Sequence, residues 1–438
     1  MKSLEIPKVA LDALCHLNSE RYPFLLESVN HNQNNRYSIL FAYPSEQIIL
    51  NSLDDFDFLS ELESKTNMPT VNSDLPFTGG WFVYLSYELI GQIEPILRND
   101  LLPSSQAVAI AVKIPTAIVV DHLHKKTYLL DQFDNQQRIG QVLSDIAQLQ
   151  DIPTTSIQGG LSWEKEAKFT KGVERSRDYI VAGDVFQVNL SRQWQYKLTS
   201  DIKSTQVYQA LKHSNPAPFA ALANFENFSI ISSSPERLFS VDGSQIETRP
   251  IAGTHPRGSG EEDELLKQQL VNHPKEQAEH IMLLDLERND LGRVCEYGSL
   301  NVNEVMGLET YPFVHHIVSN IKGKLKQGIT IKDIISALFP GGTITGCPKV
   351  RCMQIIAELE QMPRQAYTGS LGYISSNGKM DFNILIRTIS KQDKILTFRA
   401  GAGIVFDSIA QCELEETKYK AKGVLKIFPK DKQRKAYG

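Results

Sequence analysis

The chain has few cysteines, no long apolar run and no strong excess of one charge. Its 438 residues include five cysteines, a small, odd number that argues against the disulfide framework of a secreted protein. Lys and Arg number 46 against 51 Asp and Glu. A slightly acidic chain with scattered basic residues offers no electrostatic surface for nucleic acid or an anionic membrane. We therefore expect neither kind of partner.

The N-terminus and the most apolar segment also lack targeting features. The first residues have no apolar stretch of the kind a signal peptide needs. The most apolar window, 107–120, is interrupted by Lys113 and Pro115 and is too short to span a bilayer. These features predict a cytoplasmic protein.

Several catalytic signatures are missing. The sequence has no Gly-x-Ser-x-Gly elbow and no His-Glu-x-x-His motif. Residues 341–349 have the glycine spacing of a phosphate loop, but Cys347-Pro348 stand where Lys and Ser or Thr are required. The segment 401–403 lacks the third glycine of a dinucleotide fingerprint. It predicts a strand turn where the backbone can approach a ligand closely.

A loop-rich segment at 151–163 divides the chain. Upstream, β-rich runs at 81–85, 107–120 and 127–130 predict strands with connecting helices. Downstream, helical patterns begin near residues 163, 204, 274, 331 and 348, and strand patterns occupy 185–194, 228–231, 371–374, 382–389 and 395–406. Asn377-Gly378 predicts a tight hairpin, whose two strands must be antiparallel. A purely parallel doubly wound sheet is therefore excluded there.

Two pairs of glutamates share one helical spacing. Glu276 and Glu279 lie on one face of the predicted helix 274–294, and Glu413 and Glu416 repeat the spacing after Asp407-Ser408. Either pair alone is typical of a solvated helix surface. The segment that follows Glu279, His-Ile-Met-Leu-Leu, is however too apolar to be fully exposed. Two such faces brought together would offer the oxygen ligands that Mg²⁺ prefers.

Polar residues also interrupt two predicted strands. Alternation over 185–191 places Gln187, Asn189 and Ser191 on one face, which could meet solvent or line a cavity. Arg387 lies inside the apolar run 382–389, and a guanidinium in a buried strand needs an anionic partner. That partner is either a structural carboxylate or a substrate. With carboxylates available for a metal, the arginine favours a small substrate bearing more than one carboxylate.

The chain resembles the chorismate-utilising enzymes, a family that includes the large subunits of aminodeoxychorismate synthase and anthranilate synthase. The motifs that carry the resemblance appear in family order at 183–190, 234–237, 249–254, 279–294, 316–319, 339–349, 372–374 and 400–403. The resemblance implies an α/β (α+β) fold with two large, mostly antiparallel sheets packed together and helices outside. It also implies an N-terminal domain of the anthranilate synthase component I type over 1–150 and a chorismate-binding catalytic domain over 163–428.

The resemblance assigns roles residue by residue. Glu279 and Glu416 would bind Mg²⁺, assisted by Glu276 and Glu413, and the metal would hold the ring carboxylate of chorismate. Glu236 would be the general acid that assists loss of the C4 hydroxyl, with His316 close to the enolpyruvyl group. The implied substrate-binding residues are Tyr373, Arg387, Thr345 and the backbone of Gly401, Ala402 and Gly403.

The expected reaction is an amination. Gln187 stands where relatives that add water carry a lysine base. Because the chain shows no cysteine-histidine glutaminase motif, ammonia would come from a glutamine amidotransferase subunit. Hydroxide is a poor leaving group from an allylic carbon, so an acid and a metal are what the chemistry requires.

The motifs conflict on which carbon of chorismate, C2 or C4, is aminated. In the lysine type of aminodeoxychorismate synthase, a lysine of Pro-Ile-Lys-Gly-Thr attacks C2 before ammonia enters at C4. Here that motif ends at Thr254 and has Ala252 in place of the lysine. Alanine cannot be a nucleophile, which favours anthranilate synthase, the enzyme that forms anthranilate and pyruvate for tryptophan synthesis.

Other segments favour aminodeoxychorismate synthase, which makes 4-amino-4-deoxychorismate for 4-aminobenzoate and folate synthesis. They are 84–89, 215–221, 340–346 and 369–373. Phe219 and Ala220 replace a tyrosine-methionine pair that helps shape the tryptophan feedback pocket of anthranilate synthases. We expect the folate-pathway reaction. A tryptophan pocket, if retained, would use Leu26, Glu27, Ser28, Asn215, Pro216 and Phe219.

A third hypothesis is a catalytically silent, tryptophan-binding regulatory protein on the same scaffold. The chain keeps all four glutamates together with Glu236, Arg387 and Tyr373. A silent binder would not need a metal site, so these residues argue for an enzyme.

Overall fold

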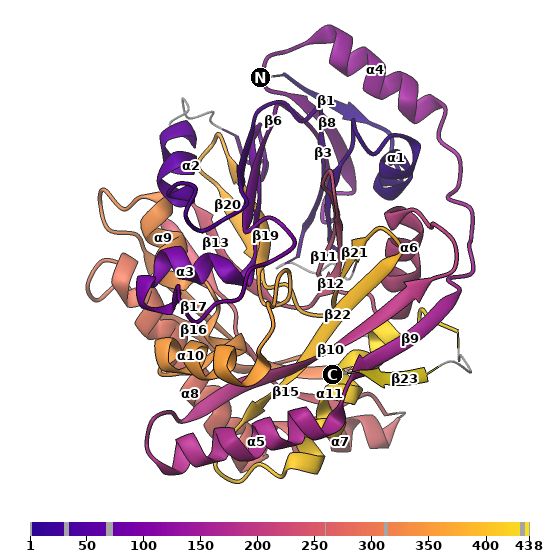
Figure 1. The fold of residues 1–438 in the computed structure, drawn as a ribbon. Helices are drawn as coiled ribbons and strands as arrows, with labels where there is room; N and C mark the ends of the chain where they lie inside the picture. Colours follow the sequence, from indigo (N-terminus) through magenta and orange to yellow (C-terminus); the bar gives the residue numbers. More distant parts are fainter. Residues whose placement is uncertain are drawn as a thin grey trace.

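The computed structural model describes residues 2–29, 35–66, 73–258, 260–310, 314–429 and 434–437. Over these residues all the strands belong to two large sheets, and all their pairings are antiparallel except that of β9 with β23 (Figure 1). The first sheet has the order β1-β8-β7-β3-β2-β11-β12-β21-β22-β10-β9-β23, with β18 beside β10. Its strands are β1 (Lys2–Ile6), β2 (Phe24–Glu27), β3 (Tyr37–Ala42), β7 (Thr116–Asp121), β8 (Lys126–Asp131), β9 (Gly159–Glu164), β10 (Gln187–Leu198), β11 (Phe219–Asn224), β12 (Ser229–Ser234), β18 (Gly346–Cys347), β21 (Thr388–Gln392), β22 (Ile395–Ile404) and β23 (Arg434–Tyr437).

The second sheet has the order β15-β17-β14-β13-β20-β19-β5-β6-β4, with β16 beside β17. Its strands are β4 (Gln47–Leu50), β5 (Gly80–Leu85), β6 (Ala109–Ile114), β13 (Arg237–Asp242), β14 (Gln245–Thr248), β15 (Ile251–Pro256), β16 (Asn301–Thr310), β17 (Val314–Lys324), β19 (Ser370–Ser375) and β20 (Met380–Asn383). The mixed α/β fold with two large sheets confirms the expected class.

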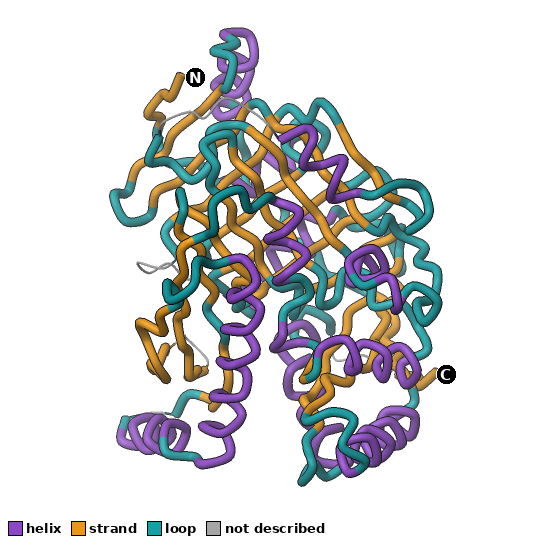
Figure 2. The backbone as a smooth tube through the Cα atoms, turned by 90° about the vertical axis from the view of Figure 1, so that its left-hand side faces the viewer, coloured by secondary structure: helices purple, strands orange, loops and turns teal. Residues whose placement is uncertain are grey.

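Helices lie mostly at the periphery of the crossing strands (Figure 2). They are α1 (Leu11–Leu17), α2 (Phe58–Thr66), α3 (Ile90–Ile93), α4 (Gln136–Ala147), α5 (Glu166–Val181), α6 (Ser204–Ser214), α7 (Glu261–Val271), α8 (Pro274–Val294), α9 (Ile331–Leu338), α10 (Lys349–Glu360) and α11 (Ala410–Leu425), with 3₁₀ turns η1 (Tyr87–Leu89), η2 (Pro95–Leu97) and η3 (Gly342–Ile344). None of the helices in the described ranges is both long and apolar enough to cross a membrane.

Aromatic side chains join the two sheets face to face. Phe24 of the first sheet stacks on Phe82 of the second, with ring centroids 4.2 Å apart. Phe41 of the first sheet meets both Phe82 and Phe77 edge-on. Such rings bury large apolar areas, so these contacts fix how the sheets pack.

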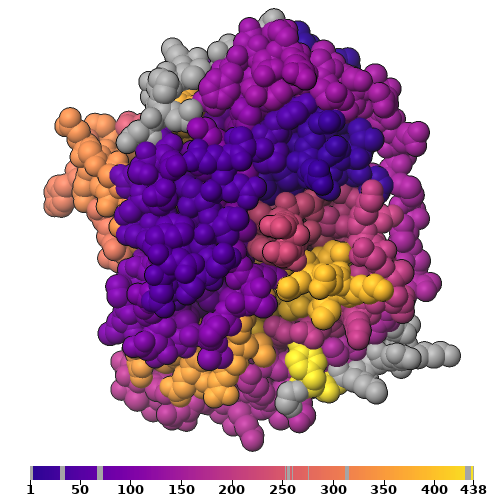
Figure 3. All heavy atoms as spheres, turned by 45° about the horizontal axis from the view of Figure 1, so that its top comes forward, coloured from indigo at the N-terminus to yellow at the C-terminus, as the bar shows by residue number. Residues whose placement is uncertain are grey.

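Strands from both sides of the loop at 151–158 share each sheet. β2 pairs with β11 in the first sheet, and β5 pairs with β19 in the second. Figure 3 shows N-terminal and C-terminal segments covering one face side by side. The boundary between 1–150 and 163–428 stays a prediction, but each sheet is continuous across it.

Most expected elements are present, and one placement is wrong. The hairpin at Asn377-Gly378 joins the antiparallel strands β19 and β20, with Gly378 at φ 83°. The run 382–389, expected to be one strand, is broken instead, because β20 belongs to the second sheet and β21 to the first. Arg387 lies in the crossing between them, at φ 52°. It therefore occupies a left-handed turn and not the middle of a buried strand.

Candidate active site

Glu236 lies in the turn between β12 and β13 and is almost fully buried, at 5% exposure. Thr343 of η3 donates its hydroxyl hydrogen bond to Glu236 Oε1 at 2.9 Å. Burial raises the pKa of Glu236 to about 8, and the nearby Glu287 carboxylate acts in the same direction. Arg387 opposes this rise, though less strongly. At neutral pH Glu236 is thus a protonated carboxylic acid able to donate a proton.

Arg387 and His316 share the surroundings of Glu236. Burial lowers the pKa of Arg387, and the Glu236 carboxylate is one of the groups that favour its charged form. Burial and the Arg387 charge together lower the pKa of His316 to about 3. His316 is therefore neutral near pH 7. The three residues form one electrostatic cluster with a single fixed positive charge.

The polar face of β10 forms a second wall of the site. Gln187 donates its amide hydrogen bond to Glu279 Oε1 at 3.0 Å, and Asn189 donates to the Thr343 carbonyl at 3.4 Å. Asn189 is thereby linked through Thr343 to Glu236. Gln187 and Ser191 are buried and Asn189 is half-buried, so this face does not meet bulk solvent.

Glycines on β22 leave room for this wall. A Cβ on Gly403 would collide with the Gln187 side chain, and one on Gly401 would come within 2.8 Å of the Tyr367 hydroxyl. Both glycines pair with β10, opposite Asn189 and Ser191. The segment 401–403 thus lies along the polar face, and its role in binding substrate stays a prediction.

Tyr367 is a site residue that the sequence analysis missed, and Tyr373 does not lie beside it. The Tyr367 hydroxyl lies against Gly401, whereas Tyr373 packs edge-on against Phe77, with ring centroids 5.7 Å apart, and lines a different cavity. Because both tyrosines lie within the short segment 367–373, their positions in the sequence do not indicate which of them faces Gly401. Only the direction of each side chain separates them.

The acidic helices α8 and α11 approach one another. Burial raises the pKa of Glu279, and the carboxylates of Glu276 and Glu416 add to the rise. Lys420 pairs with Glu416 at 2.7 Å and also stabilises the charge of Glu279. Glu413 is buried on the same helix, α11. Glu279 and Glu416, one on each helix, therefore share the cationic side chain of Lys420.

The carboxylate oxygens of these glutamates are the type of ligand that a hard cation prefers. Carboxylate oxygens are what Mg²⁺ prefers, and their mutual repulsion would be relieved by a divalent ion. In the described parts of the chain, however, no three His, Cys, Asp or Glu side chains are gathered as ligands of one ion. The magnesium site stays a prediction.

The remaining predicted catalytic positions are described only in part. The backbone of β15 pairs Ala252 with Ile317 and Thr254 with His316. The side chains of Ala252 and Thr254 lie outside the described part of the structure. Thr345 is fully buried, and its hydroxyl donates to the Gly341 carbonyl at 3.0 Å. Its carbonyl accepts from the backbone N–H of Asn189, so Thr345 holds the loop against β10.

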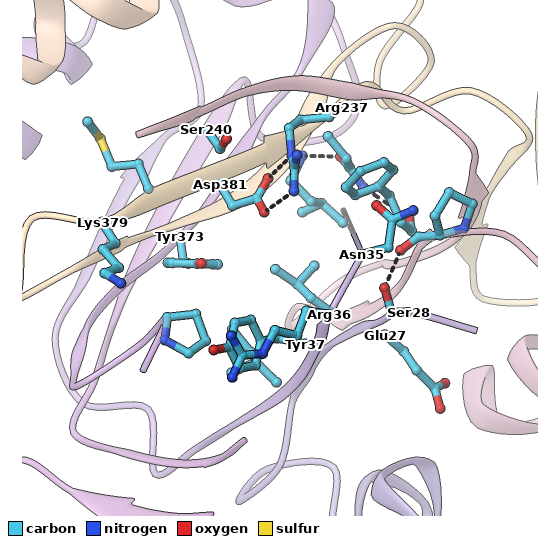
Figure 4. A pocket seen from close by; sticks show the side chains of 18 of the residues that line it. Glu27, Ser28, Asn35, Arg36, Tyr37, Arg237, Ser240, Tyr373, Lys379 and Asp381 are labelled. Carbon is cyan, nitrogen blue, oxygen red and sulfur yellow. Dashed lines mark hydrogen bonds and ion pairs between the residues drawn. The ribbon is translucent and has the colours of Figure 1, made fainter. Parts of the chain in front are cut away.

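A separate cavity of about 320 Å³ brings together part of the predicted tryptophan pocket (Figure 4). Leu26, Glu27, Ser28 and Phe219 line it, and Asn215 and Pro216 are not among its described lining residues. The Glu27 carboxylate accepts from Tyr208 and pairs with Lys212 of α6 at 2.7 Å. Its charge is therefore already compensated from outside the cavity.

The wall opposite carries an ion pair. Arg237 and Asp381 pair at 3.0 Å on neighbouring strands, and Tyr373 lies beside them. Tyr373 thus belongs to this cavity by position.

Comparisons with known proteins agree with the fold. Residues 21–426 match the sequence pattern of the chorismate binding enzymes. The chain belongs to that family.

Individual relatives carry different names. The chain is 41% identical over 371 residues to aminodeoxychorismate synthase component 1 of Bacillus subtilis, covering 82% of this chain and 78% of the relative. It is 39% identical over 408 residues to an anthranilate synthase component I-like protein of Synechocystis sp., covering 91% and 84%. The crystal structure of anthranilate synthase component I from Streptococcus pneumoniae superposes with a TM-score of 0.80 at 33% identity, covering 91% of this chain and 93% of that one.

Proposed function

We propose that this protein aminates chorismate to 4-amino-4-deoxychorismate. The observation that carries the proposal is the buried, protonated Glu236, whose pKa of about 8 keeps a proton available for the departing hydroxyl. A carboxyl group exposed to water would be ionised at this pH. The likeness to aminodeoxychorismate synthase component 1 and the residues Phe219-Ala220 favour C4 as the site of amination.

Each wall of the site has a task in this reaction. Arg387 holds the enolpyruvyl carboxylate by a charge-assisted hydrogen bond. Glu236 donates its proton to the hydroxyl, which leaves as water when the carbon–oxygen bond breaks. Mg²⁺ bound by Glu279 and Glu416 would offset the charge of the ring carboxylate.

Two amide oxygens on β10 suit ammonia as the nucleophile. Gln187 Oε1 and Asn189 Oδ1 are buried and have no hydrogen-bond partner in the part of the chain that the structure describes. A buried acceptor without a partner is costly, and an ammonia molecule would supply the missing N–H groups. The ammonia would come from a glutamine amidotransferase subunit.

Ala252 supports a second candidate, anthranilate synthase component I. A position without a lysine cannot supply the covalent route to C4 amination. Ammonia would then enter at C2, and pyruvate would be eliminated. Relatives of that name are similar to this chain along most of its length.

Product analysis with ammonium as the nitrogen source separates the candidates. The purified chain is incubated with chorismate, Mg²⁺ and a high concentration of ammonium salt, with and without aminodeoxychorismate lyase, and the products are resolved by chromatography. We expect 4-aminobenzoate only when the lyase is present. Anthranilate and pyruvate formed without the lyase would overturn the proposal in favour of the second candidate.

A further inference from the structure

Glu287 is a buried carboxyl group with no task in the reaction described so far. It lies on α8, two turns beyond Glu279, and is 4% exposed. The backbone N–H of Gly342 donates to Glu287 Oε1 at 3.2 Å, and the Thr248 hydroxyl donates to Oε2 at 3.4 Å. Both donors are neutral. A carboxylate held only by neutral donors in so dry a place is costly to ionise.

The turn η3 connects Glu287 directly to the general acid. Its consecutive residues Gly342 and Thr343 donate hydrogen bonds to Glu287 and Glu236, respectively. Two carboxyl groups are therefore held against one short turn. Like charges at such a site cannot both be present without a large penalty, so ionisation of one carboxyl disfavours ionisation of the other.

The two nearby cations, Lys349 and Arg387, do not form ion pairs with Glu287 or Glu236 among the described contacts. Lys349 of α10 pairs with Asp290 at 2.5 Å, one turn along α8 from Glu287. Asp290 and burial together raise the pKa of Glu287 against the opposing effect of Lys349. On the other side Arg387 faces Glu236 and lowers its pKa in part. Lys349 is paired with Asp290, and Arg387 is assigned to the substrate carboxylate. The two carboxyl groups of Glu236 and Glu287 therefore keep a proton.

We propose that Glu287 is a positioning residue for the reaction: its carboxyl group keeps Glu236 protonated in the resting site and, through the Gly342–Thr343 turn, fixes the direction in which Glu236 presents its proton. No new bond is made to substrate by Glu287. It acts on the acid alone. The inference rests on the proposed role of Glu236.

The test is the pH dependence of turnover in Glu287→Gln. The amide keeps the shape of the side chain and an oxygen that can accept from Gly342, but removes the charge. Chorismate consumption is followed at saturating chorismate, with free ammonia held constant at every pH. We expect the alkaline loss of kcat to move to lower pH by about one unit, because Glu236 loses its like-charged neighbour. An unchanged midpoint in a folded, active Glu287→Gln protein would overturn the inference.

Two further variants separate the causes of failure. Glu287→Asp retains the charge, so its midpoint should lie closer to that of the unmodified protein than the midpoint of Glu287→Gln does. If the residue served packing alone, both variants would lower kcat or the melting temperature without moving the midpoint. Glu236→Gln tests the underlying role: if it remains fully active, the acid assignment fails together with the inference. If it is inactive while the Glu287→Gln midpoint is unmoved, only the inference fails.

Discussion

At the level of single residues, the proposed reaction depends on Glu236 keeping its proton while Arg387 keeps its positive charge. Glu236 is buried enough to hold its proton, and the hydroxyl of Thr343 and the backbone N–H of Ile251, which donate to it, are both neutral. Arg387 stays close enough to stabilise a carboxylate without ion pairing with Glu236 among the described contacts. A direct ion pair would have ionised the acid and occupied the guanidinium. Their separation leaves one proton donor and one anion-binding group.

Replacing Arg387 by methionine should weaken chorismate binding. A lost hydrogen bond to a charged group costs about 1.5–3 kcal/mol, so we expect KM for chorismate to rise by roughly 10- to 150-fold. The pKa of Glu236 should also rise, because Arg387 lowers it. Steady-state kinetics measures both effects. Arg175→Met on α5 is the matched control, since Arg175 is exposed and its described contacts are with Asp178 at 3.7 Å and with Tyr179 of the same helix. A KM equal to that of the control would contradict the assignment.

Side-chain direction is what the sequence could not supply at this scale. The resemblance assigned roles to Glu236 and to the glycines at 401 and 403 without placing them relative to β10, and the structure shows both near its polar face. It selected Tyr373 when Tyr367 lies against Gly401. Tyr367 and Tyr373 are the same residue type, lie six positions apart and are similarly buried, so the sequence cannot tell them apart. Which one faces the site depends on a turn whose geometry only the packed sheets determine.

At the scale of elements, one buried ion network holds the site strands to α10. Glu360 of α10 accepts from Arg364 at 2.6 Å and from Arg399 of β22 at 2.7 Å. The backbone N–H and hydroxyl of Ser191 on β10 both donate to Glu360 Oε1 at 2.8 Å. All four residues are buried. The network fixes β10 and β22 in the register that brings Asn189 opposite Gly403.

Neutralising Glu360 should destabilise the whole chain. Removing one partner of a buried ion pair leaves uncompensated charge and costs about 3–5 kcal/mol. Glu360→Gln leaves two buried guanidinium groups without their anion, so the free energy of unfolding should fall by that amount in urea titration. Glu358→Gln, on the exposed side of α10, is the control. A loss below about 1 kcal/mol, as for a surface pair, would contradict the role of the network.

Element boundaries followed from sequence where the signal was local. The helix 274–294 and the hairpin at Asn377-Gly378 agree with α8 and with β19–β20. Pro115 separates β6 from β7, and the chain passes there from the second sheet to the first. The run containing Arg387 also passes from the second sheet to the first, but without a proline or glycine to mark the crossing. Apolar residues continue through the crossing because both sheets are buried, so periodicity alone cannot locate the break.

At the scale of the whole molecule, the acidic site is assembled from distant segments. Glu279 and Glu416 are carried by α8 and α11, which the folded chain brings near one Lys420. Neither helix alone offers more than a common surface pair of glutamates. The predicted metal site is therefore a property of the tertiary fold, and its occupancy should be coupled to substrate.

Mg²⁺ and chorismate together should raise the melting temperature more than the sum of their separate effects. Each ligand binds the folded state, and a metal that contacts the substrate carboxylate makes the two binding events mutually favourable. Thermal unfolding with either ligand, both or neither measures the coupling. Glu279→Gln should lose it. Stabilisation by tryptophan alone, without any effect of chorismate, would instead support a silent regulatory protein.

Chorismate consumption by Glu236→Gln is the decisive measurement, because Glu236 is the proposed acid in the conversion of chorismate. Wild type and variant are compared across pH with ammonium as the nitrogen source, Mg²⁺ present and free ammonia held constant. General acid catalysis contributes about 10²- to 10⁴-fold, so the variant should be slower by that factor. Wild-type activity should fall as pH rises through about 8, where Glu236 loses its proton. If the Glu236→Gln protein consumes chorismate at the wild-type rate, Glu236 is not the acid of this reaction.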